Sequence, residues 1–589
     1  MYAVRLIVCA LLAHAWLFCQ AQGLRPDAPT SAPMRVSAVN YDIRGVLDWP
    51  KKTFHGQMTL TWRNTGTVPA QGLPLRLCLN ALKDAGGSCQ ISSVTSGGEG
   101  LAHAIGKDET IRWVRLPNAV PPGASIAIDV EWDAAFPKMQ RGCGWAAGFL
   151  VAAKWYPKIC GYKGDTWAVE PLDPCDSDSG GFGDYDVELS LPNALQLANT
   201  GMVVVPLDKS GRPATDAMGR EVEAIPDPQR RLNFIYKIHA EDVRDFSWIA
   251  TPNGNWRLAR LDSGATQVFI YCIPKNGSQL KRLKDAIVSA LRYAEQRLTP
   301  YPYPVLSVVD LPLVALGDGV SAPMLAAISN TAFDPFNQRF TPEQAAIAQL
   351  GDQLFKWTIA ADGPGGQKFA QGLSNWFTDR VMESEYLCIM RGRRFSMDSR
   401  FRPWQARFVF SCLPFPWLPP MPNTPPESDR TASKPFAQLD ALLGEDAMED
   451  AVRSYLTGCS LGVDDFWTTH LAGTGALDYR IKAVSMGCNG MGAVTLERVG
   501  DVIVPITLRV LLKDGREALR EWDGKDKVAT LHFSGPILEA ALDPMGRYPT
   551  LKGGLHTTWT AAPKRRGLLY WASMLSGAFC GLLQGMGIG

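Results

Sequence analysis

Histidine and cysteine, the residues that most often bind zinc or act as nucleophiles, are sparse or unsuitably spaced in this chain. Its 589 residues include 7 His and 13 Cys, without a CxxC pair or a Cys/His cluster of zinc-finger spacing. The sequence has one match to GxSxG, Gly458–Gly462 (GCSLG), the turn that exposes the catalytic serine of many hydrolases, but the motif alone does not identify a catalytic serine. These residues therefore predict neither a structural zinc site nor serine catalysis.

A stretch of alternating carboxylates is the next candidate for chemistry. Asp176–Gly180 (DSDSG) resembles the start of a calcium-binding loop, but position 12 of that loop would be Val187 where a bidentate Glu is needed. We expect an ordinary polar loop here and no calcium cofactor.

The composition is that of a globular protein. The chain is 46% hydrophobic and 20% charged and contains 18 Trp, which excludes a disordered chain or a coiled coil. Because 59 Lys+Arg nearly balance 58 Asp+Glu, there is no electrostatic basis for nucleic-acid binding. At about 100–200 residues per domain, the length predicts several folding units.

Two regions have the alternation that is typical of β-strands. In residues 35–250, the segments Gly45–Trp49, Gln57–Trp62 and Ser125–Trp132 alternate β-branched or aromatic residues with polar ones. A second β-rich region covers residues 491–545. Turn residues separate the segments in both regions, as expected for antiparallel strands.

The region between them contains helical patterns. Ser278 can cap an amphipathic helix that Pro300 ends, and Val305–Leu313 reads as a buried strand. Thr341–Gln344 is a capping box with Pro at the first helical position, so it predicts a second helix. Leu413–Pro426 is a Pro-rich loop. The order β-rich, helical, β-rich predicts an α+β multidomain fold.

The N-terminus has the pattern of an export signal. One Arg precedes the apolar run Leu6–Cys19, and small and polar residues follow where a peptidase could cut. We therefore predict a signal peptide over residues 1–22 and an exported protein, periplasmic or extracellular. An uncleaved membrane anchor is the alternative.

Export would allow disulfides to form. Cys78 and Cys89 bracket a short polar loop, and Cys143 and Cys160 bracket another segment. Both are candidate pairs, although spacing alone does not define the connectivity.

The C-terminus combines a basic cluster with an apolar tail. Lys564, Arg565 and Arg566 precede Gly567–Gly589, a segment without a charged residue that includes Trp571. Three arrangements remain open: a helix lying in the membrane interface, an anchor spanning the bilayer, or a helix docked on protein. Each of them predicts a membrane or protein partner for the tail.

Short motifs follow one another along the chain. Three of them are Lys154–Pro157 (KWYP), Asp245–Trp248 (DFSW) and Tyr301–Pro304 (YPYP). The others are Gly56–Asn64, Gly183–Val187, Asn199–Gly201, Asp501–Pro505 and Glu521–Gly524. In kind and order they resemble the M1 family of zinc aminopeptidases, the gluzincins related to leukotriene A4 hydrolase and aminopeptidase N, in its short bacterial branch.

The resemblance implies the domain order. It predicts an N-terminal β saddle, a thermolysin-like α/β middle domain, a C-terminal β domain and an apolar C-terminal helix. The corresponding ranges are a signal peptide at 1–22, the saddle at 35–252, the degenerate peptidase domain at 255–475, the C-terminal β domain at 488–560, and the tail at 564–589.

The zinc site of the family does not survive in the matching residues. The family carries HExxH on a helix, with a third ligand, Glu, 19 residues beyond the second His. The alignment puts Ala348 and Asp352 at the two His positions and Gln349 at the general base. Counting 352 + 19 places Gln371 at the third ligand. Since Ala348 has no donor atom and Gln371 offers only a carbonyl oxygen, no zinc cofactor is expected.

Two further catalytic positions differ from the family. Ser321 stands where the family uses a Glu to bind the substrate amine, and no Tyr between Tyr386 and Tyr455 can stabilise an oxyanion. The resemblance thus implies a pseudoenzyme rather than an enzyme. It would act as a binding or scaffold subunit at the cell envelope, with protein partners, a membrane-associated tail and a cleft able to hold a peptide.

Two alternatives stay open. The first is a functional zinc-dependent aminopeptidase with relocated, non-standard ligands. The second is a peptide-holding module in which Asp352 or Asp318 pairs with the amine of a ligand.

Overall fold

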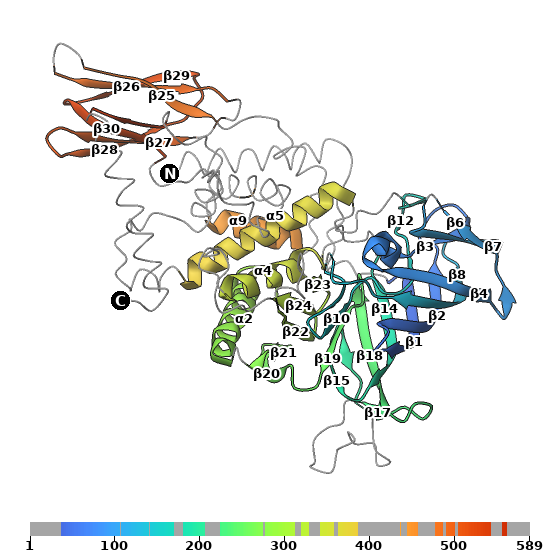
Figure 1. The fold of residues 1–589 in the computed structure, drawn as a ribbon. Coiled ribbons are helices and arrows are strands. Elements are labelled where there is room, and N and C mark those ends of the chain that lie inside the picture. Colours follow the sequence, from blue (N-terminus) through green and yellow to red (C-terminus); the bar gives the residue numbers. More distant parts are fainter. Residues whose placement is uncertain are drawn as a thin grey trace. The chain divides into compact units, whose positions relative to one another are not determined.

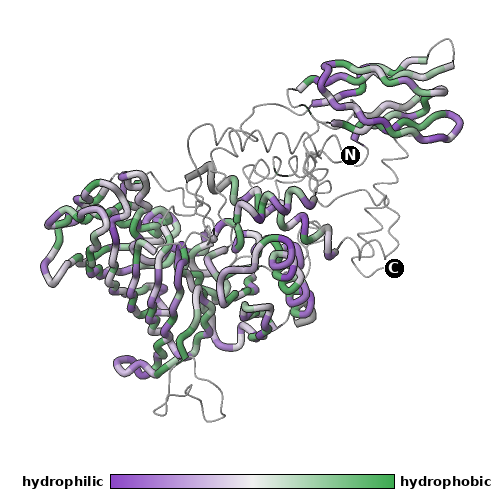
Figure 2. The backbone as a smooth tube through the Cα atoms, turned by 180° about the vertical axis from the view of Figure 1, so that it is seen from behind, coloured by the Kyte–Doolittle hydropathy of each residue, from purple (hydrophilic) through white to green (hydrophobic). Residues whose placement is uncertain are grey.

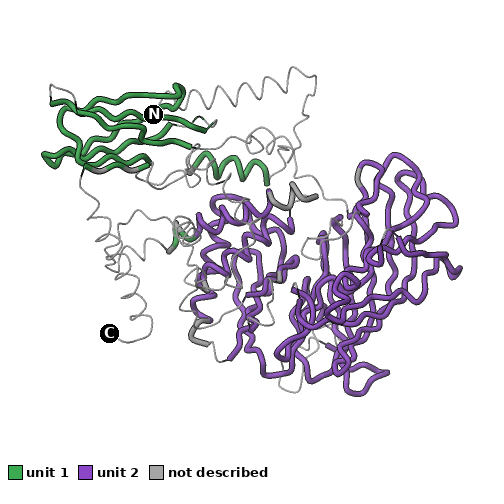
Figure 3. Tube along the Cα trace, turned by 45° about the horizontal axis from the view of Figure 1, so that its top comes forward, with its two compact units in different colours: residues 1–30, 333–339, 382–589 green, residues 31–332, 340–381 purple. Residues whose placement is uncertain are grey.

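The structure is a computed structural model of the full chain. It has two compact units (Figure 3): a larger unit of Ser31–Ala332 and Phe340–Val381, and a smaller unit of Met1–Thr30, Phe333–Arg339 and Met382–Gly589. Each unit is described by itself. The residues that the structure describes are 37–106, 108–140, 142–169, 181–205, 224–274, 277–312, 320–328, 342–358, 363–386, 436, 445–456, 478–486, 490–500, 503, 505–543 and 557–561.

The larger unit begins with a nine-stranded sheet (Figure 1), in the order β16-β18-β14-β1-β2-β8-β4-β5, with β17 paired to β18. Buried and exposed side chains alternate along β1, β2 and β8, because one face covers a core and the other faces solvent. Figure 2 shows the backbone coloured by the hydropathy of each residue. The strands are β1 (Val39–Asp48), β2 (Thr53–Arg63), β4 (Ser88–Ser96), β5 (Glu99–Gly100), β8 (Ser125–Ala135), β14 (Gly183–Pro192), β16 (Met202–Val203), β17 (Ile225–Pro226) and β18 (Asn233–Val243).

Two four-stranded sheets and a hairpin complete this β region. Trp62, Trp132, Trp155 and Trp248 are fully or almost fully buried in it, so large aromatic rings make up much of the core. The elements are β3 (Ala70–Arg76), the 3-10 helix η1 (Cys78–Ala85), β6 (His103–Ile105), β7 (Ile111–Val120), β9 (Gly144–Ala146), β10 (Phe149–Ala152), β11 (Lys158–Ile159), β12 (Tyr162–Lys163), β13 (Thr166–Trp167), β15 (Leu195–Asn199) and β19 (Trp248–Pro252).

A buried polar cluster lies inside this core. The carboxylate of Asp245 accepts hydrogen bonds from Tyr156 Oη at 2.8 Å and from the backbone N–H of Phe246 at 2.8 Å. Lys158 Nζ lies 4.0 Å from the other carboxylate oxygen. Burial raises the pKa of Tyr156 well above its ordinary value, so the phenol stays protonated and keeps donating.

The second part of the larger unit is a five-stranded mixed sheet in the order β20-β21-β22-β24-β23. Strands β21, β22 and β24 are parallel to one another, and the two edge strands, β20 and β23, pair antiparallel. The elements are β20 (Arg257–Ser263), β21 (Thr266–Cys272), α2 (Gly277–Arg297), β22 (Val305–Asp310), β23 (Val320–Ala322), β24 (Leu325–Ile328), α4 (Pro342–Phe355) and α5 (Gly363–Val381). The buried strand and the two helices predicted here are confirmed.

In the smaller unit, a three-stranded sheet (β25-β26-β29) and a four-stranded sheet (β28-β27-β30-β31) share one apolar core. The second predicted β-rich region is therefore confirmed. The elements of this unit are the π-helix η3 (Met382–Tyr386), α9 (Glu445–Leu456), β25 (Tyr479–Met486), β26 (Gly492–Arg498), β27 (Ile506–Leu512), β28 (Glu517–Trp522), β29 (Val528–Phe533), β30 (Ile537–Leu542) and β31 (Thr558–Thr560).

These elements confirm a multidomain fold of mixed sheets and few helices. The saddle and thermolysin-like assignments and the domain ranges stay predictions. Among the described residues, no helix is long and apolar enough to cross a bilayer. The signal peptide, the loop at Asp176–Gly180 and the Pro-rich loop lie outside the described residues, as does the tail with Lys564, Arg565, Arg566 and Trp571.

The two candidate disulfides are not formed. Cys78, Cys89, Cys143 and Cys160 are buried, and none of them is in a disulfide. The segment from Cys78 to Ala85 is a 3-10 helix rather than an open loop, and the thiol of Cys143 points at a backbone carbonyl, that of Ala153, at 3.0 Å. The thiol of Cys143 therefore has a backbone partner, which the spacing of the cysteines did not indicate.

Candidate functional site

The face of α4 that aligns with the two zinc-binding histidines is turned toward α5. Asp352 on this face is 8% exposed, and its Oδ1 accepts a hydrogen bond from Ser374 Oγ of α5 at 2.6 Å. Its Oδ2 accepts one from Lys356 Nζ, one helical turn later, at 2.9 Å. We call Asp352, Ser374 and Lys356 the Asp352 latch. Ala348, one turn before Asp352, contributes only its carbonyl oxygen, 3.4 Å from Ser374 Oγ.

The latch lies where the two helices approach closely. A Cβ atom on Gly351 would lie 2.8 Å from Ser374 Oγ, 2.9 Å from its carbonyl oxygen and 3.3 Å from Phe377 Cδ1. Any residue with a Cβ atom would therefore overlap with Ser374 at this position. Phe377 also packs edge to face against Phe355 of α4, with ring centroids 6.0 Å apart. The α4–α5 contact is thus filled by protein atoms.

The neighbouring face of α4 is held by the mixed sheet. Gln353 is fully buried, and its Nε2 donates to the carbonyl of Ala322 at 2.7 Å. Its Oε1 accepts from the backbone N–H of Met324 at 2.8 Å and from Tyr301 Oη at 3.3 Å. Gln349 lies one turn earlier on the same face. Its Oε1 is buried without a hydrogen-bond partner among the described residues, and a neutral amide cannot act as a general base.

Ser321, aligned with the amine-binding Glu, lies on the edge strand β23. Its Oγ accepts a hydrogen bond from Trp357 Nε1 at 2.8 Å, and Gln353 Nε2 lies 3.5 Å away. The hydroxyl therefore links Trp357, which follows α4, to the edge strand β23. It carries no charge that could balance a substrate ammonium group.

Gln371, aligned with the third zinc ligand, lies on α5 one turn before Ser374 and is half-buried. Its Nε2 donates to Asn375 Oδ1 at 3.1 Å. Within the described parts of the chain, no three His, Cys, Asp or Glu side chains converge on a point where they could hold a metal ion.

This donor set does not fit zinc. The carboxylate at Asp352 already has two protein partners, and the side chains at the other two aligned ligand positions, Gln371 and Ala348, offer an amide and a methyl group. The structure thus places all five predicted positions on α4, α5 and β23. Asp352 pairs with an amine of this chain, Lys356, and Asp318, its proposed alternative as an amine anchor, lies outside the described residues.

Sequence reasoning missed two residues of the site. Lys356 could have been found, because a Lys four residues after an Asp faces it on a helix. Ser374 could not, because its contact with Asp352 joins two helices and leaves no local pattern.

Comparison with known proteins finds a likeness among solved structures. No family model matches the sequence, and no curated protein is similar to it. Among solved structures, the chain is similar to an M1 zinc metallopeptidase from Deinococcus radiodurans, with 14% sequence identity and a TM-score of 0.47. The match covers 73% of this chain and 89% of that chain. At this identity and TM-score the likeness says nothing about activity.

Proposed function

We propose that the chain is a catalytically inactive, M1-aminopeptidase-like protein that acts as a binding or scaffold subunit at the cell envelope. The observation that carries the proposal is the Asp352 latch. It uses the one carboxylate left at the aligned zinc position to join α4 to α5. The order of the sequence motifs supports the relationship, and the absent base at Gln349 supports the loss of activity.

Zinc content is the direct test. We expect purified protein, dialysed against a weak chelator, to contain far less than one zinc per chain by elemental analysis. It should also release no product from aminoacyl anilide substrates. Near-stoichiometric zinc together with hydrolysis would instead establish the rival function, an aminopeptidase with non-standard ligands.

A variant that restores the zinc ligands of the family provides a positive control for this test. The triple variant Ala348→His, Asp352→His, Gln371→Glu carries the family's three ligand types. If the alignment is correct, this variant should bind more zinc than the natural chain. Equal zinc content in the two proteins would mean that α4 and α5 are not the former metal site, whatever the natural chain does.

The binding role rests on two features. One is Oε1 of Gln349, a buried acceptor without a hydrogen-bond partner among the described residues, which the N–H group of a peptide inserted against α4 would satisfy. The basic and apolar tail, with Lys564, Arg565, Arg566 and Trp571, suits a membrane surface or a membrane complex.

Co-sedimentation with liposomes tests the tail. We expect the full chain to sediment with vesicles that contain anionic lipid, and a chain that ends before Lys564 to remain in the supernatant. Equal sedimentation of both would remove the tail from the proposal. Affinity capture with the full chain, with the shortened chain as the matched control, would then identify protein partners.

A further inference from the structure

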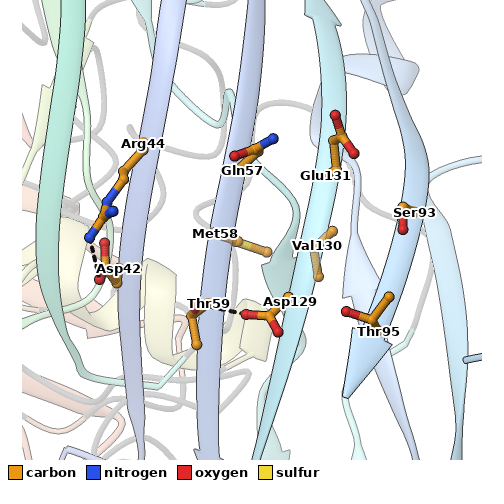
Figure 4. Close-up of a pocket in the computed structure, with 10 residues that line it drawn as sticks. All are labelled: Asp42, Arg44, Gln57, Met58, Thr59, Ser93, Thr95, Asp129, Val130 and Glu131. Atoms are coloured by element: carbon orange, nitrogen blue, oxygen red, sulfur yellow. Dashed lines mark hydrogen bonds and ion pairs between the residues drawn. The ribbon is translucent and has the colours of Figure 1, made fainter. Parts of the chain in front are cut away.

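The exposed face of the nine-stranded sheet carries a row of side chains that crosses six strands. The strand register joins, in order, Thr95, Asp129, Thr59, Asp42, Asp186 and His239. Figure 4 shows the first four, which line a shallow depression of about 370 Å³ on β1, β2, β4 and β8. We call these six residues the carboxylate row.

The next row along the strands is balanced in charge. It contains Glu131, Arg44, Glu188 and Lys237. Lys237 Nζ lies 2.8 Å from Glu188 Oε1, and Arg44 Nε lies 3.9 Å from Glu188 Oε2. Since opposite charges alternate across the strands, this row needs no further partner.

The carboxylate row is not balanced in the same way. Asp42 and Asp186 are direct neighbours on the parallel strands β1 and β14, and like charges in directly opposed positions destabilise a sheet. Arg44 Nη2 lies 3.4 Å from Asp42. His239 Nδ1 lies 2.7 Å from Asp186. The negative charge of Asp186 is therefore balanced by an imidazole, a group that can lose its positive charge.

Both ring nitrogens of His239 meet carboxylates. Nδ1 faces Asp186 Oδ1 of β14 at 2.7 Å, and Nε2 faces Glu241 Oε1 of its own strand at 3.0 Å. An ionised carboxylate only accepts hydrogen bonds, and a neutral imidazole has only one N–H. Two such contacts therefore require the doubly protonated ring. Because the carboxylates lie at opposite nitrogens, they do not converge on a shared metal ion.

We propose that His239 is a proton-controlled clamp on the exposed face of the sheet. With its proton, the ring joins Asp186 of β14 to Glu241 of β18. When the proton leaves, the ring can donate to only one of them, and Asp42 and Asp186 remain as like-charged neighbours. The face has then lost one positive charge, so its net charge is more negative by one. This inference is independent of the proposed function.

The surroundings of the ring agree with such a clamp. Hydrogen bonds that the ring donates to Glu241 and then to Asp186 raise the pKa of His239, although partial burial opposes them. Because the folded-state pKa lies above the unfolded value, the stabilisation is complete below the unfolded pKa and is lost as the pH rises through the folded pKa. Among the described residues, the charged groups on the strands around His239 are Asp184, Asp186 and Glu188 on β14 and Lys237 and Glu241 on β18, with Asp42 on β1 beyond Asp186, and β16 places Met202 opposite the ring.

NMR of the full chain labelled with [13Cε1]histidine tests the clamp. The chain has 7 His, and the signal missing from His239→Gln identifies the one of interest. We expect its titration midpoint to lie above the ordinary value for His, and to fall in both Asp186→Asn and Glu241→Gln. Two carboxylate variants are used so that one is available if the other fails to fold. A midpoint at or below the ordinary value, or one unchanged by these variants, would overturn the proposal.

Thermal unfolding tests the coupling to stability. The Tm of the natural chain minus that of His239→Gln should be larger at pH 5.5 than at pH 8, by about 1–3 °C for an exposed charge pair. The matched control is His532→Gln, the same substitution at an exposed His on β29. A pH-independent difference for His239→Gln would show that the ring is an ordinary surface group.

Discussion

Replacing Ser374 with alanine should destabilise the larger unit by about 1.5–3 kcal/mol, the usual worth of a buried hydrogen bond to a charged group. Ser374 is 1% exposed and Asp352 is 8% exposed, so water cannot easily take the place of the lost hydroxyl. Oδ1 of Asp352 would then be a buried acceptor without its donor. Lys356→Met should cost less, because the Lys356 side chain is 28% exposed and its ion pair is partly screened.

Thermal and urea unfolding of the full chain measure this effect. At about 1.4 °C per kcal/mol for a unit of roughly 340 residues, Ser374→Ala should lower the Tm of the larger unit by about 2–4 °C. The matched control is Ser92→Ala, since Ser92 Oγ donates to the carbonyl of Glu131 at an exposed position. Its effect should stay within about 0.5 kcal/mol.

A double-mutant cycle measures the interaction energy between Ser374 and Asp352. Ser374→Ala should cost little in a chain that already carries Asp352→Ala, because its acceptor is gone, and the coupling should be about 1 kcal/mol or more. Additive effects of the two substitutions would refute the latch. The latch also predicts that neither a chelator nor added zinc changes the Tm, and a zinc-dependent rise would contradict the assignment of the site.

Three other predictions follow from the packing of the larger unit. Gly351→Ala should cost about 1–3 kcal/mol in urea unfolding, because its Cβ would lie 2.8 Å from Ser374 Oγ; an unchanged midpoint would mean that the helices separate freely. Asp245→Ala should cost about 3–5 kcal/mol, since it removes a buried carboxylate that accepts hydrogen bonds from Tyr156 Oη and the Phe246 N–H and lies 4.0 Å from Lys158 Nζ, and a loss below 1 kcal/mol would contradict that account. Burial raises the pKa of Cys143 to about 12, so its thiol should resist alkylation at pH 8 until urea unfolds the chain, and rapid native-state labelling seen by mass spectrometry would disprove this.

Local patterns in the sequence were sufficient to predict helices and strands of the larger unit. The capping box at Thr341–Gln344 predicts a helix, and α4 begins at Pro342, because proline at the first turn gives up only an N–H that has no partner there anyway. The apolar run after Tyr301–Pro304 predicts a buried strand, and all six residues of β22 are buried. Such features depend on neighbours within a few residues, so they can be read from one chain.

Residue identities at the candidate site were equally informative about what the site lacks. Ala348 cannot donate electrons to a metal and Gln349 cannot take a proton, whatever surrounds them. The sequence does not say what these positions do instead. Their partners come from other elements, namely Ser374 on α5 for Asp352, and β23 with the turn after it for Gln353, one helical turn beyond Gln349.

Tertiary structure alone decided the rest. The burial of Asp352 against Ser374 depends on the close approach of α4 and α5, which Gly351 permits. The alignment of Asp42, Asp186 and His239 in one row depends on β1 pairing in parallel with β14 over a long sequence separation. A one-residue change of register would have moved these side chains to the opposite face. Charge pairing across strands is set by register, and register is a property of the assembled sheet.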